Sequence, residues 1–220
     1  MPVHDWSRVD AGVFHDFHLA WVVEIANALN TGLLPPDYYA MIEQHRGSAD
    51  PDGITLPVQT DDYVRKRRTV AIRHSRDDRI VALVEVVCPA TKKERHAFQS
   101  FVEKVVASLA RGYQLLVIDL HSHCQHTGKD IHSEIWEKIS GDQASLQSDK
   151  PLMLTAYTAG AEKRAYVEAM AVGDSLPDMP LFLDPGCCLS VPLEQTYQAA
   201  YRGLPDRWRK ALESRLDELG

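Results

Sequence analysis

The sequence has no apolar run that approaches the roughly 20 residues needed to cross a bilayer, and it contains only four cysteines. Its opening, MPVHDWSRVD, lacks the basic and then apolar regions of a secretory leader. Cys88, Cys124, Cys187 and Cys188 show no CxxC spacing, and a chain of this length folds without disulfide staples. These absences predict a cytoplasmic protein with free thiols and no membrane partner.

Several catalytic and nucleotide-binding signatures are also missing. The patterns GxGxxG, GxxxxGK and GxSxG do not occur in the sequence. Their absence excludes the usual dinucleotide-binding and P-loop sites, together with the nucleophile elbow of α/β-hydrolases. No Cys–His pair stands out as a nucleophile with its base.

An excess of positive charge is missing as well. The 31 acidic residues outnumber the 24 Lys and Arg residues, which gives a net charge of −7. Such a chain has little general affinity for nucleic acid. The stretch from Arg65 to Arg95 is an exception, with ten basic and four acidic residues. It either follows a phosphate backbone or forms the solvated surface of strand edges and loops.

The composition itself is that of a globular protein, because 45% hydrophobic residues suffice to bury a core. Apolar spacing predicts helices at 14–30, 91–112, 131–139, 193–203 and 206–219. It predicts strands at 38–44, 54–58, 68–74, 79–87, 113–120, 152–158 and 164–172. We expect one α/β domain over 1–220, with a mixed central sheet flanked by helices. Its core spans 14–120, and a C-terminal hairpin and helical extension, 121–220, packs on that core.

Glu85 is the most informative residue, because it is the one carboxylate in the apolar strand 79–87. Burying it costs several kcal/mol unless it is paired or binds a metal. Glu43 and Asp52 lie in or beside the preceding strands, and Lys92 and Lys93 open the following helix. Carboxylates that hold Mg²⁺, with a lysine to stabilise developing charge, suit phosphodiester hydrolysis. The alternative partner of Glu85 is an arginine or backbone amides.

A family resemblance supports the hydrolytic interpretation. The segments HDWSRVDAGVFHDFH, LLPPDYYAMIEQ, VALVEVVCPATKKERHAF and LPDMPLFL resemble, in this order, an uncharacterised bacterial family, domain-of-unknown-function family 4058. The core of that family is similar to the PD-(D/E)XK nuclease superfamily. The clearest link is the segment of Glu85, Val86, Pro89 and Lys92. The resemblance implies a restriction-endonuclease-like core and a Mg²⁺-dependent nuclease.

The resemblance also implies roles for individual residues. Asp52, after Pro51, would be the first acid and Glu85 the second; both would hold Mg²⁺, with Glu43 as an auxiliary acid. The lysine expected two residues after the second acid is Val87 here, so Lys92, or Lys93 in its place, would reach back from the helix. The DNA or RNA backbone would contact Arg65, Lys66, Arg67, Arg68 and Lys93.

Two alternatives belong to other classes of protein. The first is a non-catalytic α/β module that binds a protein partner, favoured by the missing lysine at Val87 and by the acidic net charge. The second, weaker alternative is a zinc-dependent hydrolase that uses His121, His123, Cys124 and His126, whose HxHCxH spacing is not that of a standard closed site. The oligomeric state stays open, a homodimer included.

Three further residues have both a structural and a functional interpretation. His15 and His18 lie one turn apart on the first predicted helix and could face the same direction. His18 falls in the apolar stripe, which favours a core histidine bonded to the backbone. Asp119 ends a buried strand, where functional groups of α/β proteins often lie, or it caps the loop that follows.

Overall fold

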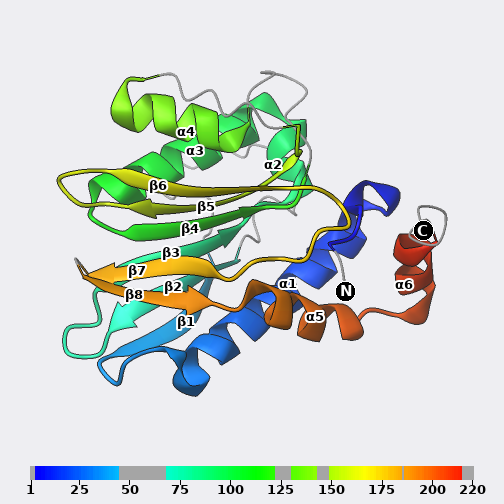
Figure 1. Ribbon diagram of the computed structural model, residues 1–220, viewed down its shortest axis with the longest axis horizontal. Helices are drawn as coiled ribbons and strands as arrows, with labels where there is room; N and C mark the ends of the chain where they lie inside the picture. Colours follow the sequence, from blue (N-terminus) through cyan, green and yellow to red (C-terminus); the bar gives the residue numbers. More distant parts are fainter. Residues whose placement is uncertain (1–2, 45–67, 122–129, 143–148, 185, 215–220) are drawn as a thin grey trace, which may run out of the picture.

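The structure is a computed structural model that describes residues 3–44, 68–121, 130–142, 149–184 and 186–214. Its main sheet contains six strands in sequential order (Figure 1): β1 (Tyr38–Gln44), β2 (Arg68–His74), β3 (Ile80–Val86), β4 (Gln114–Asp119), β5 (Leu152–Thr158) and β6 (Arg164–Met170). β3 and β4 run parallel, and the other neighbouring strands of this sheet are antiparallel. The predicted α/β class with a mixed sheet is therefore confirmed.

The parallel step from β3 to β4 is made by two helices instead of the single predicted one. α2 (Pro89–Lys93) begins directly after β3, with Cys88 as its N-cap residue. Proline suits the first helical position because the amide it lacks would have no intrahelical partner there. The chain then becomes extended at Glu94 before α3 (Arg95–Ala110). The apolar stripe of α3 packs on the sheet, as its 3.6-residue spacing predicts.

The two faces of the sheet are covered by different elements, which we call the α3 face and the α1 face. Side chains alternate along a strand, so Leu83 and Val87 of the β3 segment pack with α3, while Val84 and Val86 pack with α1 (Ala11–Ala28). Glu85 has the parity of the α3 face. The α3 face also carries α4 (Ile131–Ser140).

The α1 face is completed by the C-terminal part of the chain (Figure 1). A second, two-stranded sheet, β7 (Met179–Asp184) and β8 (Cys187–Val191), packs on it through β7. α5 (Leu193–Arg202) lies against α1, and α6 (Asp206–Glu213) follows. The apolar spacing predicted α4, α5, α6 and the hairpin of β5 and β6, whereas β7 and β8 were not predicted. The strand predicted at 54–58 lies outside the described residues.

The helices that the structure describes include none that combines the length and the apolar character needed to cross a membrane.

Candidate functional site

Glu85 lies in the middle of the main sheet, in the central strand β3, beside Val117 of β4. It is only 2% exposed. Its Oε1 atom accepts hydrogen bonds from the Thr69 hydroxyl, at 2.8 Å, and from the Lys104 ammonium, at 2.6 Å. Among the described residues, an ammonium and a hydroxyl group thus offset the cost of burying this carboxylate.

Lys104 reaches Glu85 from α3, the helix that covers this face of the sheet. The side chain of Lys104 is 25% exposed, and its Nζ atom also donates to Thr69 Oγ1 at 3.2 Å. A lysine at position 87 would lie on the same face of β3 as Glu85. The Lys104 amine therefore lies on the face of β3 where the nuclease resemblance predicts a lysine.

Lys104 was not predicted as a site residue, although the sequence carries a signal for it. Lys104 follows Phe101 by three residues and directly precedes Val105, both of which are buried in the core. A charged residue at the border of an apolar helical stripe points toward the packed face and needs a partner there. Glu85 is that partner.

The two hydrogen bonds that Glu85 accepts from described residues both end on Oε1. Within the described ranges, Oε2 receives no hydrogen bond from protein groups. A carboxylate with one oxygen held by an amine and the other left with its lone pairs can still bind a cation through the second oxygen.

Glu43 lies on the same face, two strands away from Glu85. Its register partner in β2 is Thr69, which stands between the two acids. The strand spacing puts the backbones of Glu43 and Glu85 roughly 10 Å apart. The Glu43 carboxylate accepts a hydrogen bond from Arg73 Nε at 3.0 Å, in an ion pair. Glu43 thus lies on the same face of the sheet as Glu85 but is bound to an arginine.

The remaining predicted residues of this site are only partly described. Asp52, Arg65, Lys66 and Arg67 lie outside the described residues. Arg68 begins β2 and is half-buried, and Lys93 is exposed at the end of α2.

Lys92 forms an ion pair elsewhere. Its Nζ atom lies 2.5 Å from Asp119 Oδ2, at the end of β4, and it also donates to the carbonyl of His121. Both side chains are buried, at 7% and 6% exposure. Burial raises the pKa of Asp119, and the Lys92 charge opposes that rise. The ion pair of Lys92 and Asp119 joins α2 to β4. The amine beside Glu85 comes from Lys104.

A second group of functional side chains, the strand-end cluster of His15, His18 and Cys88, lies on the α1 side of the molecule. α1 provides the two histidines, and Cys88 follows the end of β3. Their ligand atoms all lie within 4.8 Å of one another. Sequence spacing suggested that the histidines share a face, but it gave no sign that Cys88 joins them.

His121, the described member of the predicted HxHCxH zinc set, lies near this cluster. Its ring packs edge-on against Phe14 of α1, with 4.4 Å between ring centroids. Burial, with smaller contributions from Lys92 and His18, lowers the pKa of His121 to about 3. The other three members, His123, Cys124 and His126, lie outside the described residues.

No family model matches this chain, and neither a curated protein nor a solved structure is similar enough to it to count as a relative. The resemblance to family 4058 and to the nuclease superfamily stays a prediction from sequence motifs.

Proposed function

We propose that the chain is a Mg²⁺-dependent phosphodiesterase that acts on nucleic acid, with Glu85 and Lys104 at the centre of its site. The observation that supports this proposal best is the 2.6 Å contact between the Lys104 ammonium and Glu85 Oε1. An acid on the central strand next to an amine is the combination that the nuclease resemblance requires. The amine comes from α3 instead of position 87.

The fit of Mg²⁺ to this site rests on Glu85 Oε2, which receives no hydrogen bond from the described part of the chain. Glu85 would hold the ion together with the predicted ligand Asp52. When bound, Mg²⁺ would neutralise charge on the phosphate and make a nearby water more acidic. Lys104, a quarter exposed, would stabilise negative charge that develops on the phosphate.

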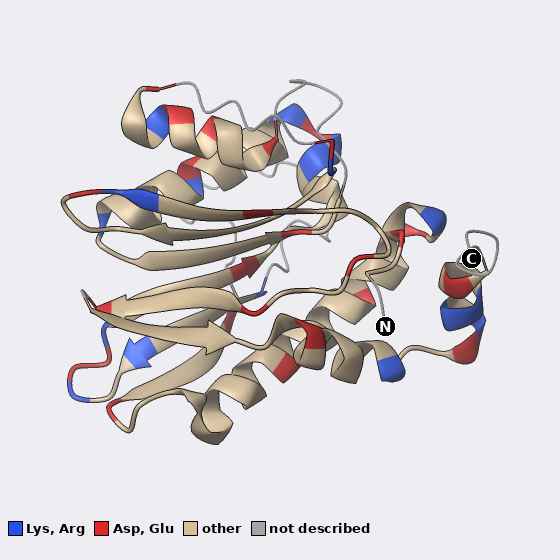
Figure 2. Ribbon diagram, in the orientation of Figure 1, with Lys and Arg blue, Asp and Glu red and all other residues tan. Residues whose placement is uncertain are grey.

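Basic residues that could contact the nucleic-acid backbone lie between β3 and α3. Figure 2 shows Lys and Arg gathered at α2 and at the start of α3. Lys93 is exposed there, whereas Lys92 is buried. Lys93 is therefore the better candidate for phosphate contact, together with Arg68 and with Arg65, Lys66 and Arg67, which were predicted from the sequence.

The test is cleavage of single- and double-stranded DNA and of RNA, with and without Mg²⁺. Glu85→Gln and Lys104→Met should each lower the cleavage rate by about 10²-fold or more, as loss of a transition-state stabiliser does. Lys138→Met, which removes an exposed lysine of α4, is the matched control and should cleave normally. Circular dichroism would establish that each variant is folded. Undiminished cleavage by folded Glu85→Gln would refute the proposal.

The second candidate function is a non-catalytic protein-interaction module, and one observation favours it. Glu43, Glu85 and Asp119 each have a cationic partner, so the fold balances these charges without an ion. In this case Glu85 and Lys104 form a structural pair. Calorimetry with Mg²⁺ and Mn²⁺ separates the two candidates, because the module predicts no heat of binding and no cleavage of any substrate.

A further inference from the structure

The strand-end cluster of His15, His18 and Cys88 is built by two elements that meet at the carboxyl end of β3. His15 and His18 lie one helical turn apart on α1, and Cys88 is the N-cap residue of α2. In open α/β sheets, ligands bind outside the carboxyl ends of the strands. Cys88 has the parity of the α1 face, whereas Glu85 has that of the α3 face, so this cluster is separate from the proposed nuclease site.

One distance within the cluster matches that expected between two ligands of a tetrahedral zinc ion. Bonds of about 2.0–2.1 Å from zinc to a histidine nitrogen and about 2.3 Å to a cysteine sulfur put these two ligand atoms about 3.6 Å apart. His18 Nδ1 and Cys88 Sγ lie 3.6 Å apart. The His15 ligand atom falls within the same 4.8 Å limit. All three ligand atoms thus lie close enough together to approach one ion.

The packing of the cluster supports a preformed site. His18 is fully buried, and its ring lies parallel to that of Phe14, with 6.4 Å between centroids and 3° between planes. Cys88 is 8% exposed, and the short helix that it caps fixes its backbone. His15 is half-buried and reaches solvent. Two ligands are thus held by the core, and the third stands at the rim.

The ligand set selects the class of metal. Thiolate and imidazole are ligands of zinc and related transition metals, whereas Mg²⁺ and Ca²⁺ prefer oxygen. Structural zinc sites use four protein ligands, whereas sites with three leave a position for water or substrate.

We infer that His15, His18 and Cys88 bind one zinc ion, and that the described residues leave its fourth position to a further ligand. This site is distinct from the one at Glu85 and does not depend on the proposed nuclease activity. Lys92 lies four residues after Cys88, on α2, and donates to the carbonyl of His121 after the end of β4.

The experiment measures metal content and affinity on the full chain. The purified protein is stripped with a chelator and titrated with Zn²⁺, and then with Co²⁺, whose thiolate complexes absorb in the near ultraviolet. We expect one ion per chain and a thiolate-to-cobalt absorption band. Loss of an outer-shell partner weakens metal binding by about 10–100-fold, so removal of a ligand should weaken it by more than about 100-fold.

The variants are chosen so that folding does not obscure the result. Cys88→Ser and His15→Gln should lose the ion, and His15→Gln leaves the buried core intact because His15 is half-buried. Cys188→Ser removes an exposed cysteine of β8 and should bind zinc like the parent chain.

Glu85→Gln separates this site from the proposed function, because it should lower the cleavage rate by about 10²-fold or more and leave zinc binding unchanged. Failure of the stripped protein to take up zinc would overturn the assignment. So would parental affinity and an unchanged cobalt spectrum in Cys88→Ser.

Discussion

Glu85 and Lys104 show that a buried charge requires polar or oppositely charged partners around it. The carboxylate is 2% exposed in a strand that is otherwise apolar, and it is tolerated there because an ammonium and a hydroxyl group bind its Oε1 atom. A buried carboxylate that loses its cation stays charged in a poorly solvated position or takes up a proton. The stability of the sheet therefore depends on Lys104 as well as on Glu85.

We predict that Lys104→Met destabilises the protein more than Glu85→Gln/Lys104→Met, in which both charges are removed. Breaking a buried ion pair from one side costs about 3–5 kcal/mol. The single variant should lie at the low end of this range because Lys104 is 25% exposed. Urea unfolding of the parent chain, both single variants and the double variant measures the coupling. Additive effects in this cycle would mean that the pair contributes no interaction energy.

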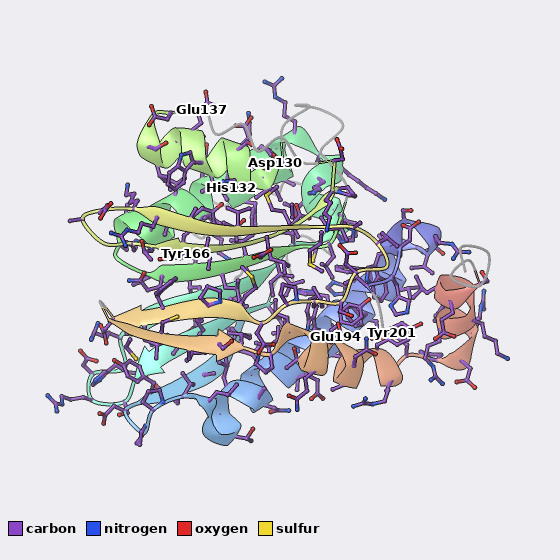
Figure 3. All side chains as sticks on the ribbon, in the orientation of Figure 1. Asp130, His132, Glu137, Tyr166, Glu194 and Tyr201 are labelled. Atoms are coloured by element: carbon purple, nitrogen blue, oxygen red, sulfur yellow. The ribbon has the colours of Figure 1, made fainter. Side chains whose placement is uncertain are left out.

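At the scale of elements, α4 begins with a well-formed cap. The Asp130 carboxylate accepts hydrogen bonds from the backbone amide of Ser133, at 2.7 Å, and from its hydroxyl, at 2.8 Å. Figure 3 labels Asp130 and His132 at this end of the helix and Glu137 further along it. His132 Nδ1 lies 2.8 Å from the Tyr157 hydroxyl of β5, which fixes α4 to the sheet.

We predict that Asp130→Ala lowers the free energy of unfolding by about 1 kcal/mol, because one amide of the first turn loses its acceptor. Asp130→Ser should retain most of the stability, since a serine oxygen can take the same position. Chemical denaturation measures both variants. Equal stability of Asp130→Ala and the parent chain would show that water replaces the cap at no cost.

The missed strands β7 and β8 illustrate a limit of local patterns at this scale. Met179, Leu181 and Leu183 alternate with less buried residues, as a strand with one buried face does. Pro180 lies between them, and a proline within an apolar run argues against a central strand. A two-stranded sheet has only edge strands, where a proline is tolerated, and Pro180 is accommodated opposite Ser190 of β8.

At the scale of the whole molecule, the N-terminal segment is held by the C-terminal helices. His4 stacks on Tyr201 of α5, with 4.0 Å between ring centroids, and its Nδ1 atom lies 2.9 Å from the Tyr197 hydroxyl. Trp6 Nε1 donates to the same hydroxyl at 3.2 Å. Figure 3 shows Tyr201 on α5, where Glu194 also lies. The Tyr201 hydroxyl in turn donates to Glu213 of α6 at 3.1 Å. These contacts join the two ends of the described chain.

This arrangement predicts a loss of stability in mild acid. Burial is the main cause that lowers the pKa of His4 from 6.5 to about 4, while Glu213 and Glu194 oppose the shift. Below pH 6.5 the unfolded chain binds a proton that folded His4 does not, so stability falls as the pH drops from 6.5 toward 4. A shift of this size contributes at most about 3 kcal/mol.

The variant His4→Phe tests this prediction, because it keeps an aromatic ring against Tyr201 and removes the titrating group. Unfolding free energies measured between pH 7 and pH 4 should fall less steeply for the variant than for the parent chain. Identical slopes would exclude His4 as a source of the pH dependence. The buried His121 remains in both proteins and adds the same slope to each.

The sequence alone determined the order and type of most elements, because helical and strand periodicities are local. It also identified Glu85 as the residue that needs a partner, since the apolar residues around it belong to one strand. Only the tertiary structure decided which groups meet: Lys104 with Glu85 across 19 residues, and Cys88 with His18 across 70. The packing of α3 and α1 on opposite faces of one sheet sets these contacts, and the spacing within a single element carries no information about its neighbour.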